Sequence, residues 1–337
     1  ARGREKKAGK KSPEIITHIE EIMKTETAGD PMTGLKWTKK ATAKIAVELG
    51  RVGIVVDAKT VGRLLVKMGF TLKTCRKNIE AGRKYQTGHR ERRDQQFRNV
   101  KRLRKKFERL GLPVISVDSK KKEKVGNFKN EGKTWRREPK EVFDHDFPSH
   151  AKGKAIPYGI YDTQKNKALV VVGTSSETPA FATDAIEMWW RLQGKREYKS
   201  VKRIMILADC GGGNSYRSTV WKRDVQTKLC NRHGLTVSIN HYPPGASKWN
   251  PIEHRLFSQI SNSWAGVPLD SNETVLKYIS STTTKTGLTV KAILNEKTYL
   301  KGQKASKLEM DNLNIERDNL HPEWNYTIKP QKSVAEM

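Results

Sequence analysis

Three acidic residues have the types and spacing of a site for divalent cations. Asp118 and Asp209 each follow a short run of apolar and β-branched residues, and Glu253 falls in the first turn of an expected helix. Carboxylate oxygens are the ligands that hard cations such as Mg²⁺ prefer. A pair of such ions can activate an attacking oxygen and stabilise a leaving oxygen during phosphodiester cleavage. The three acids therefore predict metal-dependent phosphoryl transfer, provided that the fold brings them together.

The two aspartates each have a structural alternative. Asp118 could simply cap the end of its strand, but Lys120, Lys121 and Lys122 follow it, and we expect these lysines to hold the phosphates of a nucleic acid. A solvated loop is the alternative for the lysines. Asp209 precedes a cysteine and three glycines, which is also typical of a turn. The glycines would equally permit the backbone to approach a ligand closely.

Glu253 has a stronger rival role. Asn250 can act as an N-cap with Pro251 in the first helical turn, which places Glu253 at the third helical position of a capping box. Glu253 shares a helix face with Phe257, so we expect that face to pack inward. In so basic a chain we favour metal ligation for Glu253, and we expect Lys248 to contact nucleic acid.

Two histidines and a pair of tryptophans in the same part of the chain give weaker evidence of a functional role. His241 and His254 flank the region and could orient a phosphate, but isolated histidines are more often packing or surface residues. The pair Trp189–Trp190 is expected in the core rather than as a platform for stacking bases.

The charge of the chain indicates its partner. Its 66 Lys and Arg against 36 Asp and Glu give a net charge of +30 and an isoelectric point near 10.0. Such an excess is typical of a protein that binds nucleic acid, the alternative being a generally adhesive or ribosome-associated basic protein. Three cysteines without a C-x-x-C pair argue against a zinc site or a disulfide framework and favour a cytosolic location. We expect no membrane span and no signal peptide.

The amino-terminal third is expected to bind DNA. Residues 1–32 are predicted to be a basic, disordered arm, with a merely solvated tail as the alternative. Residues 33–75 are predicted to form a helix-turn-helix, with Thr38 and Asp57 as the two N-caps and an ordinary αα-hairpin as the alternative. The polar side of the second helix carries the residues that we expect to contact DNA: Lys59, Thr60, Arg63 and Lys67.

A basic linker helix is predicted over residues 76–112. Residues 76–109 hold fourteen Lys and Arg against four Asp and Glu, a net charge of +10. Phe97, Val100, Leu103 and Phe107 recur every three or four positions and give the helix one apolar face. Its charged face would lie along phosphates or be solvated.

The remaining chain predicts an α/β catalytic core over residues 113–266 and a C-terminal extension over 267–337. The elements of the core follow the order β-β-β-α-β-α-β-α. Consecutive strands with short connections should pair antiparallel, and strands reached through helices should join in parallel. If the strand at 204–208 lies beside the first one, Asp118 and Asp209 fall on adjacent strands. This mixed sheet is the arrangement of the ribonuclease H-like fold.

Four long segments make the chain resemble a known family. They are Val-Ile-Ser-Val-Asp-Ser-Lys-Lys-Lys-Glu (114–123), Lys-Ala-Ile-Pro-Tyr-Gly-Ile-Tyr-Asp (154–162), Ala-Asp-Cys-Gly-Gly-Gly-Asn (208–214) and Pro-Pro-Gly-Ala-Ser-Lys-Trp-Asn-Pro-Ile-Glu-His-Arg-Leu-Phe (243–257). They resemble the ISAzo13-type (Rhodopirellula-type) insertion-sequence transposases of the DDE superfamily. Glu-Trp-Asn-Tyr-Thr-Ile-Lys-Pro (323–330) resembles the closing segment of that family, so the likeness covers about residues 37–330.

The resemblance implies a function and its residues. It implies Asp118, Asp209 and Glu253 as the DDE triad, two Mg²⁺ or Mn²⁺ ions as cofactor, and a helix-turn-helix that reads the transposon ends. It implies double-stranded DNA as partner, both terminal repeats and target, and a homodimer or higher oligomer that joins two ends in the bacterial cytoplasm. Cys210 departs from the residue expected there, usually glycine, and the amino-terminal region is shorter than expected.

Two other functions remain compatible with the sequence. One is a DNA-binding regulator derived from a transposase that has lost its chemistry, although all three acids are present. The other is a structure-specific ribonuclease H-like nuclease, which would cleave without needing particular end sequences.

Overall fold

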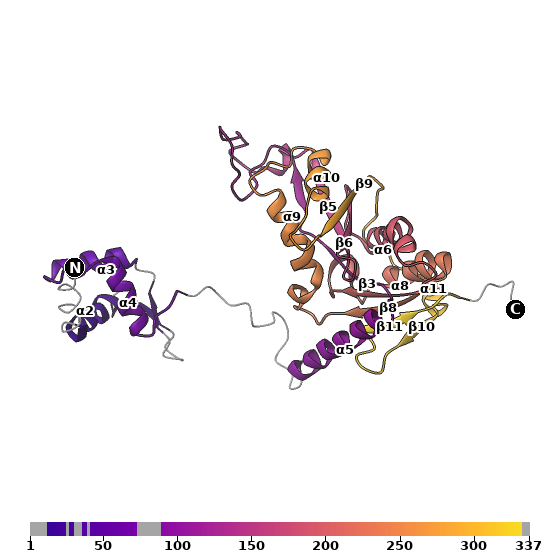
Figure 1. Ribbon diagram of the computed structural model, residues 1–337, viewed down its shortest axis with the longest axis horizontal. Helices are drawn as coiled ribbons and strands as arrows, with labels where there is room; N and C mark the ends of the chain where they lie inside the picture. The colour runs from indigo at the N-terminus through magenta and orange to yellow at the C-terminus, as the bar shows by residue number, and fades with distance from the viewer. Residues whose placement is uncertain (1–11, 25–26, 30–35, 39–40, 73–88, 332–337) are drawn as a thin grey trace. The chain divides into compact units, whose positions relative to one another are not determined.

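The computed structural model describes residues 12–24, 27–29, 36–38, 41–72 and 89–331. The chain divides into two compact units, residues 1–81 and 82–337. Figure 1 shows the elements of each unit, which are described separately. The predictions for residues 1–11 and for the start of the linker helix, residues 76–88, lie outside the described residues.

The first unit is a small helical core. Its helices are α2 (Ser12–Lys24), α3 (Thr42–Arg51) and α4 (Ala58–Lys67), and a short antiparallel pair joins β1 (Thr27–Gly29) to β2 (Lys36–Thr38). The three helices bury one apolar cluster, formed by Ile15, Ile19, Ile45, Leu49, Val61 and Leu64. The prediction of two helices joined by a short link is confirmed for α3 and α4.

Two predictions for this unit are wrong. Residues 12–24, expected within a disordered arm, form α2, because Ile15, Ile16, Ile19 and Ile22 give the segment an apolar helical face that packs into the cluster. Thr38 is not an N-cap, since it ends β2 and α3 starts after Ala41.

The cap predicted for the second helix is confirmed. The Asp57 carboxylate accepts a hydrogen bond from the Thr60 backbone N–H at 2.6 Å and so satisfies one of the free donors of the first turn. Gly69 follows α4 with a φ of +86°, the left-handed conformation in which glycine commonly ends a helix.

The second unit is built on one mixed sheet. Among the described residues nine strands contribute to it: β3 (Val114–Ser119), β4 (Glu123–Val125), β5 (Gly153–Asp162), β6 (Lys167–Gly173), β7 (Arg203–Ala208), β8 (Thr236–His241), β9 (Thr289–Asn295), β10 (Ile315–Arg317) and β11 (Asn325–Ile328). Their spatial order is β10-β11-β8-β7-β3-β5-β6-β9, and β4 pairs with β5.

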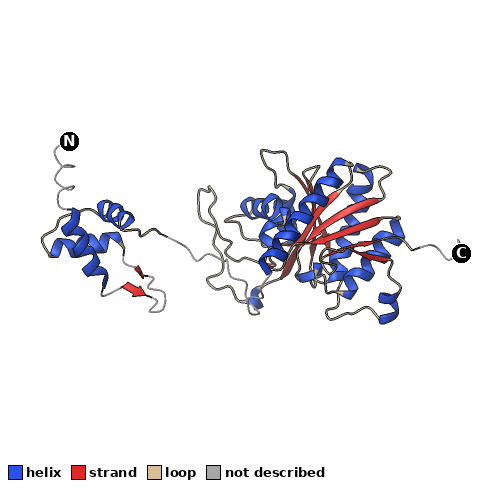
Figure 2. Ribbon diagram, turned by 90° about the horizontal axis from the view of Figure 1, so that it is seen from below, coloured by secondary structure: helices blue, strands red, loops and turns tan. Residues whose placement is uncertain are grey.

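The central pairings are those predicted for a ribonuclease H-like fold. β3, β5 and β6 form an antiparallel meander, whereas β7 joins β3 in parallel and β8 joins β7 in parallel. The chain reaches β7 and β8 through helices, which is the usual way to make parallel neighbours. Figure 2 shows the sheet with helices on both of its faces.

Helices cover the first face through a large apolar cluster. α6 (Pro179–Trp189) continues as the wider π-helical turn η2 (Trp190–Gly194) and α7 (Lys195–Glu197), and α8 (Thr219–Asp224) continues as the π-helical η4 (Val225–Asn231). Ile115 and Val117 of β3 point to this face, and Trp189 and Trp190 are buried in its cluster. The prediction that these tryptophans belong to the core is confirmed.

The opposite face of the sheet carries the helix with Glu253. It begins at Pro251 and comprises the π-helical η6 (Glu253–Phe257) and α9 (Ser258–Ser263), and α10 (Asn272–Ser280) packs beside it. The basic helix α5 (His89–Arg109) lies over β3 and β7, where its Val100 and Phe107 pack with Val114. The predicted apolar face of the linker helix is therefore confirmed within residues 89–109.

Residues after 266 belong to the same sheet. β9 pairs in parallel with β6 at one edge, and β11 pairs antiparallel with β8 at the other, with β10 outside it. The only helix between β9 and β10 in the described residues is the short α11 (Lys307–Asp311). The segment predicted as an extension therefore completes both edges of the core, so the predicted end of the core at residue 266 is wrong.

A buried amide group fixes α5 to the sheet. Gln96, which is fully buried, donates from Nε2 to the His241 carbonyl at 2.8 Å and to Asn325 Oδ1 at 2.9 Å. Asn325 returns a hydrogen bond to Gln96 Oε1 at 2.7 Å and accepts one from Asn240 at 2.8 Å. α5 is thus anchored to β8 and β11 by polar as well as apolar contacts.

No described helix is both long and apolar enough to span a bilayer.

We expect Ile19→Ala to destabilise the first unit by about 2–5 kcal/mol, because it leaves a cavity among α2, α3 and α4. Hydrogen exchange of the α3 amides in the full chain measures the change. Val47→Ala is the control, because Val47 is 61% exposed and should shift stability by less than about 0.5 kcal/mol. Unchanged exchange in Ile19→Ala would show that α2 does not stabilise this unit.

Candidate active site

The pairing of β3 with β7 places two aspartates side by side. The last paired residues in the parallel register are Ser116 and Leu207, and Asp118 and Asp209 each come two positions later. Side chains two positions apart in a strand point to the same face. Asp118 and Asp209 therefore face the side of the sheet on which the helix of Glu253 lies, and they come from adjacent strands, as the sequence predicted.

Glu253 completes the group from the first turn of that helix. It forms a hydrogen bond with Asp118 and lies close enough to Asp209 to affect its ionisation. Asn250 does not cap this helix with its side chain, which donates instead to the Val117 carbonyl at 3.1 Å. The capping box that was the alternative role for this segment is therefore replaced by contacts to β3. The structure brings all three predicted acids together.

Burial and mutual repulsion strongly affect Asp118. It is 8% exposed, and burial together with the charges of Asp209, Glu253 and Glu177 raises the pKa of its carboxyl to about 9. A hydrogen bond from the Ser119 backbone N–H, at 2.7 Å, acts in the opposite direction. A carboxyl group in this setting holds its proton at neutral pH unless a positive charge replaces it.

The two other acids respond in the same direction. Burial raises the pKa of Asp209, and hydrogen bonds from Gly211 and Asn214 oppose the shift. Burial also raises the pKa of Glu253, and its hydrogen bond with Asp118 partly offsets this. All three carboxyl groups thus occupy positions in which the anionic form needs a compensating charge.

The donor set suits a hard divalent cation. Carboxylate oxygens are preferred by Mg²⁺ and Mn²⁺, and a cation would remove the repulsion that raises these pKa values. Among the described residues, however, no three His, Cys, Asp or Glu side chains already surround one point as metal ligands. The carboxylates would therefore have to rotate to hold an ion, and the chemistry of the donors, rather than their present geometry, supports one.

A fourth acid, Glu177, lies beside the triad and was missed from the sequence. It precedes α6, and its charge contributes to the raised pKa values of Asp118 and Asp209. Lys122 pairs with it at 3.0 Å. A Cβ on Gly212, which has a φ of +53°, would strike the Glu177 carboxylate, so this glycine permits the close approach of the Asp209 loop. Only the position of Glu177 directly before a helix could have indicated it.

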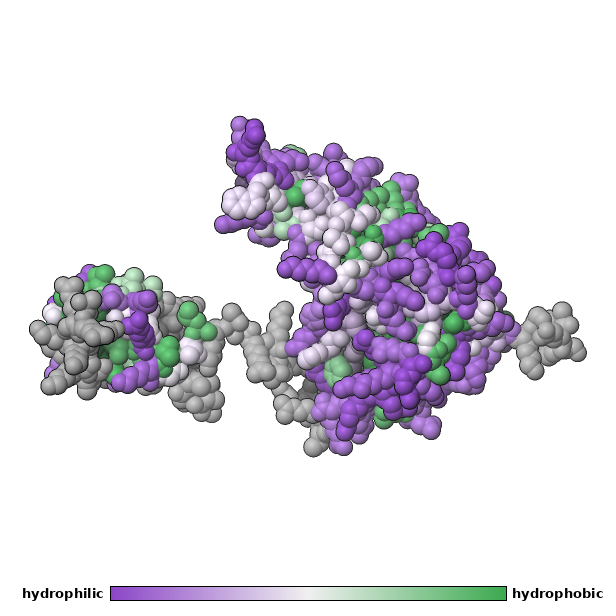
Figure 3. Space-filling model, in the orientation of Figure 1, coloured by the Kyte–Doolittle hydropathy of each residue, from purple (hydrophilic) through white to green (hydrophobic). Residues whose placement is uncertain are grey.

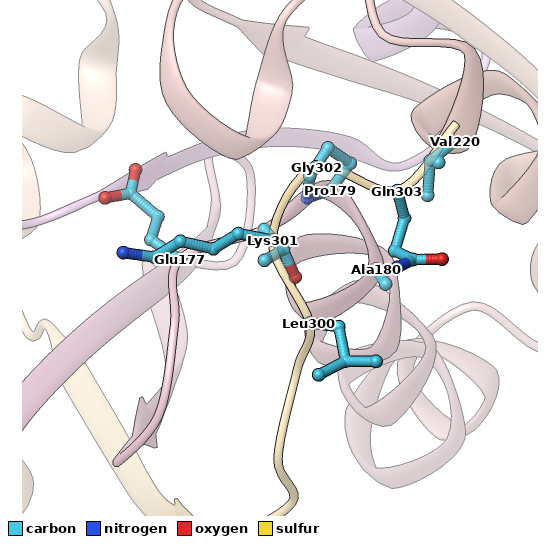
Figure 4. Close-up of a pocket in the computed structure, with 9 residues that line it drawn as sticks. Glu177, Pro179, Ala180, Val220, Leu300, Lys301, Gly302 and Gln303 are labelled. Atoms are coloured by element: carbon cyan, nitrogen blue, oxygen red, sulfur yellow. The ribbon is translucent and has the colours of Figure 1, made fainter. Parts of the chain in front are cut away.

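A small cavity of about 110 Å³ lies next to Glu177. The start of α6 and residues 300–303 form most of its wall. Figure 4 shows the Glu177 and Lys301 side chains extending to the same side, away from Leu300.

His241 has a structural place behind Asp209. Its Nδ1 lies 2.7 Å from the Asp209 carbonyl, and its Nε2 lies 3.1 Å from the Tyr326 hydroxyl. The Tyr326 hydroxyl in turn accepts a hydrogen bond from Trp221 Nε1 at 3.1 Å. Since a carbonyl only accepts, Nδ1 carries the proton and Nε2 accepts from Tyr326. Burial lowers the pKa of His241 to about 4, so the ring is neutral. The histidine thus holds the backbone of the Asp209 turn.

Cys210 is also held away from the chemistry. Its thiol donates to the Tyr242 carbonyl at 3.0 Å, and burial with the neighbouring Asp209 charge raises its pKa to about 12. The residue that departs from the expected pattern therefore stays protonated.

The predicted phosphate-contacting lysines differ in their surroundings. Lys120 is only 9% exposed in its side chain, and its amine lies 3.0 Å from Glu123 and 4.6 Å from the centre of the Trp264 ring. Lys122 pairs with Glu177, whereas Lys121 and Lys248 are exposed, the latter beside the Trp249 ring.

The predicted DNA-contacting residues of α4 lie at its start and along its exposed side. Lys59, Arg63 and Lys67 are exposed, and Thr60 is half-buried beside its cap Asp57. In the second unit, Figure 3 shows mainly hydrophilic residues over the part of the surface where Figure 1 places α5.

The chain was compared with family models, curated proteins and solved structures. The family model described as the Rhodopirellula transposase DDE domain matches residues 18–330. A search of curated proteins found no match. Similar solved structures include the Mos1 transposase paired-end complex with left transposon end, at 14% identity over 78% of this chain and 69% of that one, with a TM-score of 0.42. The Mos1 strand transfer complex matches at 12% identity over 78% and 68%, also with a TM-score of 0.42.

The order and directions of the strands define a ribonuclease H-like domain. The chain belongs to the family of the Rhodopirellula transposase DDE domain, because that model covers most of its length.

We expect the stability of the metal-free protein to fall as pH rises from about 4 to about 9. In this window the folded state keeps the proton on Asp118, whose pKa is raised to about 9, while the unfolded state releases it. Asp118→Asn should weaken this dependence and melt above the unaltered chain at pH 8. Melting curves at pH 5 and pH 8 in a chelator measure it, and equal slopes in both proteins would contradict it.

Proposed function

We propose that this protein cleaves DNA at transposon ends and joins the freed ends to target DNA. The observation that carries the proposal is the convergence of Asp118, Asp209 and Glu253 from two strands and a helix onto one side of the sheet. Hydrolysis of a phosphodiester would release a 3′-hydroxyl, and this hydroxyl would attack a target phosphodiester by direct transesterification. Both steps are displacements at phosphorus and can use the same site.

The three acids would hold two Mg²⁺ or Mn²⁺ ions. These ions, when bound, supply activation of the attacking oxygen and stabilisation of the leaving one. Asp118 and Asp209 would offer oxygens from adjacent strands, and Glu253 would offer them from the facing helix. Lys121 and Lys248, both exposed, would contact the phosphates of the strand being cleaved.

Recognition of the ends would come from the first unit. α4 presents Lys59, Arg63 and Lys67 to solvent, and a capped helix with a basic outer side suits the major groove of double-stranded DNA. The basic face of α5 would follow phosphates and add to affinity without adding sequence preference. Because two ends must be joined, we propose that the protein acts as a homodimer or higher oligomer on DNA.

Replacing Glu253 by Gln should lower Mg²⁺-dependent nicking of duplexes that carry the transposon ends by at least about 100-fold. Changes in residues that only support a metal ligand already cost about 10–100-fold, so loss of a ligand costs more. Glu273→Gln, at an exposed position in the first turn of α10, is the matched control and should cleave normally. Nicking by Glu253→Gln at the unaltered rate, with the protein folded, would remove the metal role. If random duplex inhibits the cleavage as strongly as end-containing duplex does, the protein is instead a structure-specific nuclease.

Arg63→Ala should weaken binding to end-containing DNA and reduce the salt dependence of the association constant. A residue that contacts one phosphate changes the slope of log K against log salt by about 1, whereas a base contact costs about 1–3 kcal/mol at its own position only. Fluorescence anisotropy at several salt concentrations, with end-containing and random duplexes, separates the two roles. Binding of both duplexes that matches the unaltered chain at every salt concentration would exclude α4 as the DNA-reading helix.

A further inference from the structure

Two side chains tie the helix of Glu253 directly to the strand of Asp118. The Ser116 hydroxyl donates to Asn250 Oδ1, and its oxygen accepts a hydrogen bond from the Ile252 backbone N–H at 3.0 Å. Asn250 Nδ2 donates to the Val117 carbonyl at 3.1 Å. Ser116 and Asn250 are both fully buried.

In this arrangement the first turn of the helix is not capped by a side chain of its own segment. An N-cap side chain normally accepts from the backbone of its own helix. Here Ser116, on β3, accepts from the first turn instead, which frees the Asn250 side chain to bind the strand. The helix is therefore capped by the strand that carries Asp118, and its start has a fixed position along that strand.

A glycine on the neighbouring strand sets how near the helix can come. Gly159 of β5 pairs directly with Asp118. A Cβ at Gly159 would lie 2.7 Å from Phe257 Cε1, 2.8 Å from Ile252 Cδ1 and 3.1 Å from Leu256 Cδ2. These three side chains are buried, so they have little room to withdraw. The missing side chain of Gly159 thus allows the first turns of the helix to rest on the sheet beside Asp118.

We propose that Ser116, Asn250 and Gly159 are positioning residues that hold Glu253 beside Asp118. This inference rests on the proposed function for its purpose, but its geometry is independent of it. Ser116 and Asn250 fix the helix along β3, and Gly159 fixes its height above the sheet. Glu253 stands one residue after Ile252, whose backbone is held by Ser116, so the backbone of Glu253 has little freedom to move away from the strand of Asp118. The buried contacts hold these two acids together before any cation arrives.

The test compares Ser116→Ala and Gly159→Ala with the unaltered chain. Ser238→Ala is the matched control, because it removes a hydroxyl on β8 that contacts Thr327 at 3.1 Å and touches none of the acids. Calorimetry with Mn²⁺ alone should show affinity about 10–100-fold lower in both test variants, the range found when residues supporting metal ligands are changed. Ser238→Ala should bind Mn²⁺ as the unaltered chain does. Ser116→Thr keeps the hydroxyl and should therefore recover the Mn²⁺ affinity that Ser116→Ala loses.

Nicking assays and a crystal structure distinguish a loss of Glu253 positioning from a general loss of folding. In both variants nicking of end-containing DNA should fall at low Mn²⁺ and recover as Mn²⁺ is raised, with the Kd for DNA unchanged. A crystal structure of Gly159→Ala should show a longer separation between the carboxyls of Asp118 and Glu253. This variant removes no hydrogen-bonding group, so it also serves if Ser116→Ala fails to fold.

The outcomes distinguish the two proposals. An unchanged Asp118–Glu253 separation in Gly159→Ala, or unaltered Mn²⁺ affinity in both folded variants, overturns the positioning role whether or not the protein cleaves DNA. If the unaltered chain binds Mn²⁺ without nicking DNA, the proposed function falls, and the calorimetry and the crystal structure still decide the positioning role.

Discussion

The parallel pairing of β3 with β7 is the constraint on which the candidate site depends. It sets two carboxylates on adjacent strands, two positions beyond the last paired residues Ser116 and Leu207. Like charges held this close in a buried setting are unfavourable, which the raised pKa of Asp118 shows. The sheet tolerates the arrangement because its apolar clusters on both faces hold the strands regardless of the acids. The fold thus stabilises a site that the acids alone would disfavour.

Behind the acids, neutral hydrogen-bonded groups fix the backbone without adding charge. His241, Tyr326 and Trp221 form a chain that ends on the Asp209 carbonyl, and Asn214, bonded to Tyr158 at 2.6 Å, lies under the same turn. The Ser116–Asn250 contacts do the same for the helix of Glu253. Buried polar groups that are fully paired in this way favour one arrangement over its neighbours.

The sequence allowed the central strands, their directions and the three acids to be predicted, because each depends on local patterns and on general rules of strand connection. α2 was not predicted, because the charged residues around it mask the helical spacing of its isoleucines. The predicted cap at Thr38 is wrong because this residue ends β2. Glu177 had only its position before a helix as a signal and Gly159 had none, since their importance comes from contacts between segments distant in the chain. The strands after residue 266 are short or lie at sheet edges, where alternation gives little signal.

The order in which the chain is made adds a consequence of β11. A nascent chain that has just passed Glu253 already contains all three acids, yet it lacks Tyr326, which supports His241, and Asn325, which holds Gln96 of α5. The turn that carries Asp209 therefore gains its full support only after Tyr326 has been added to the chain. Premature termination would leave the acids present but the scaffold behind one of them unfinished, so shortened products would be poorly equipped to act.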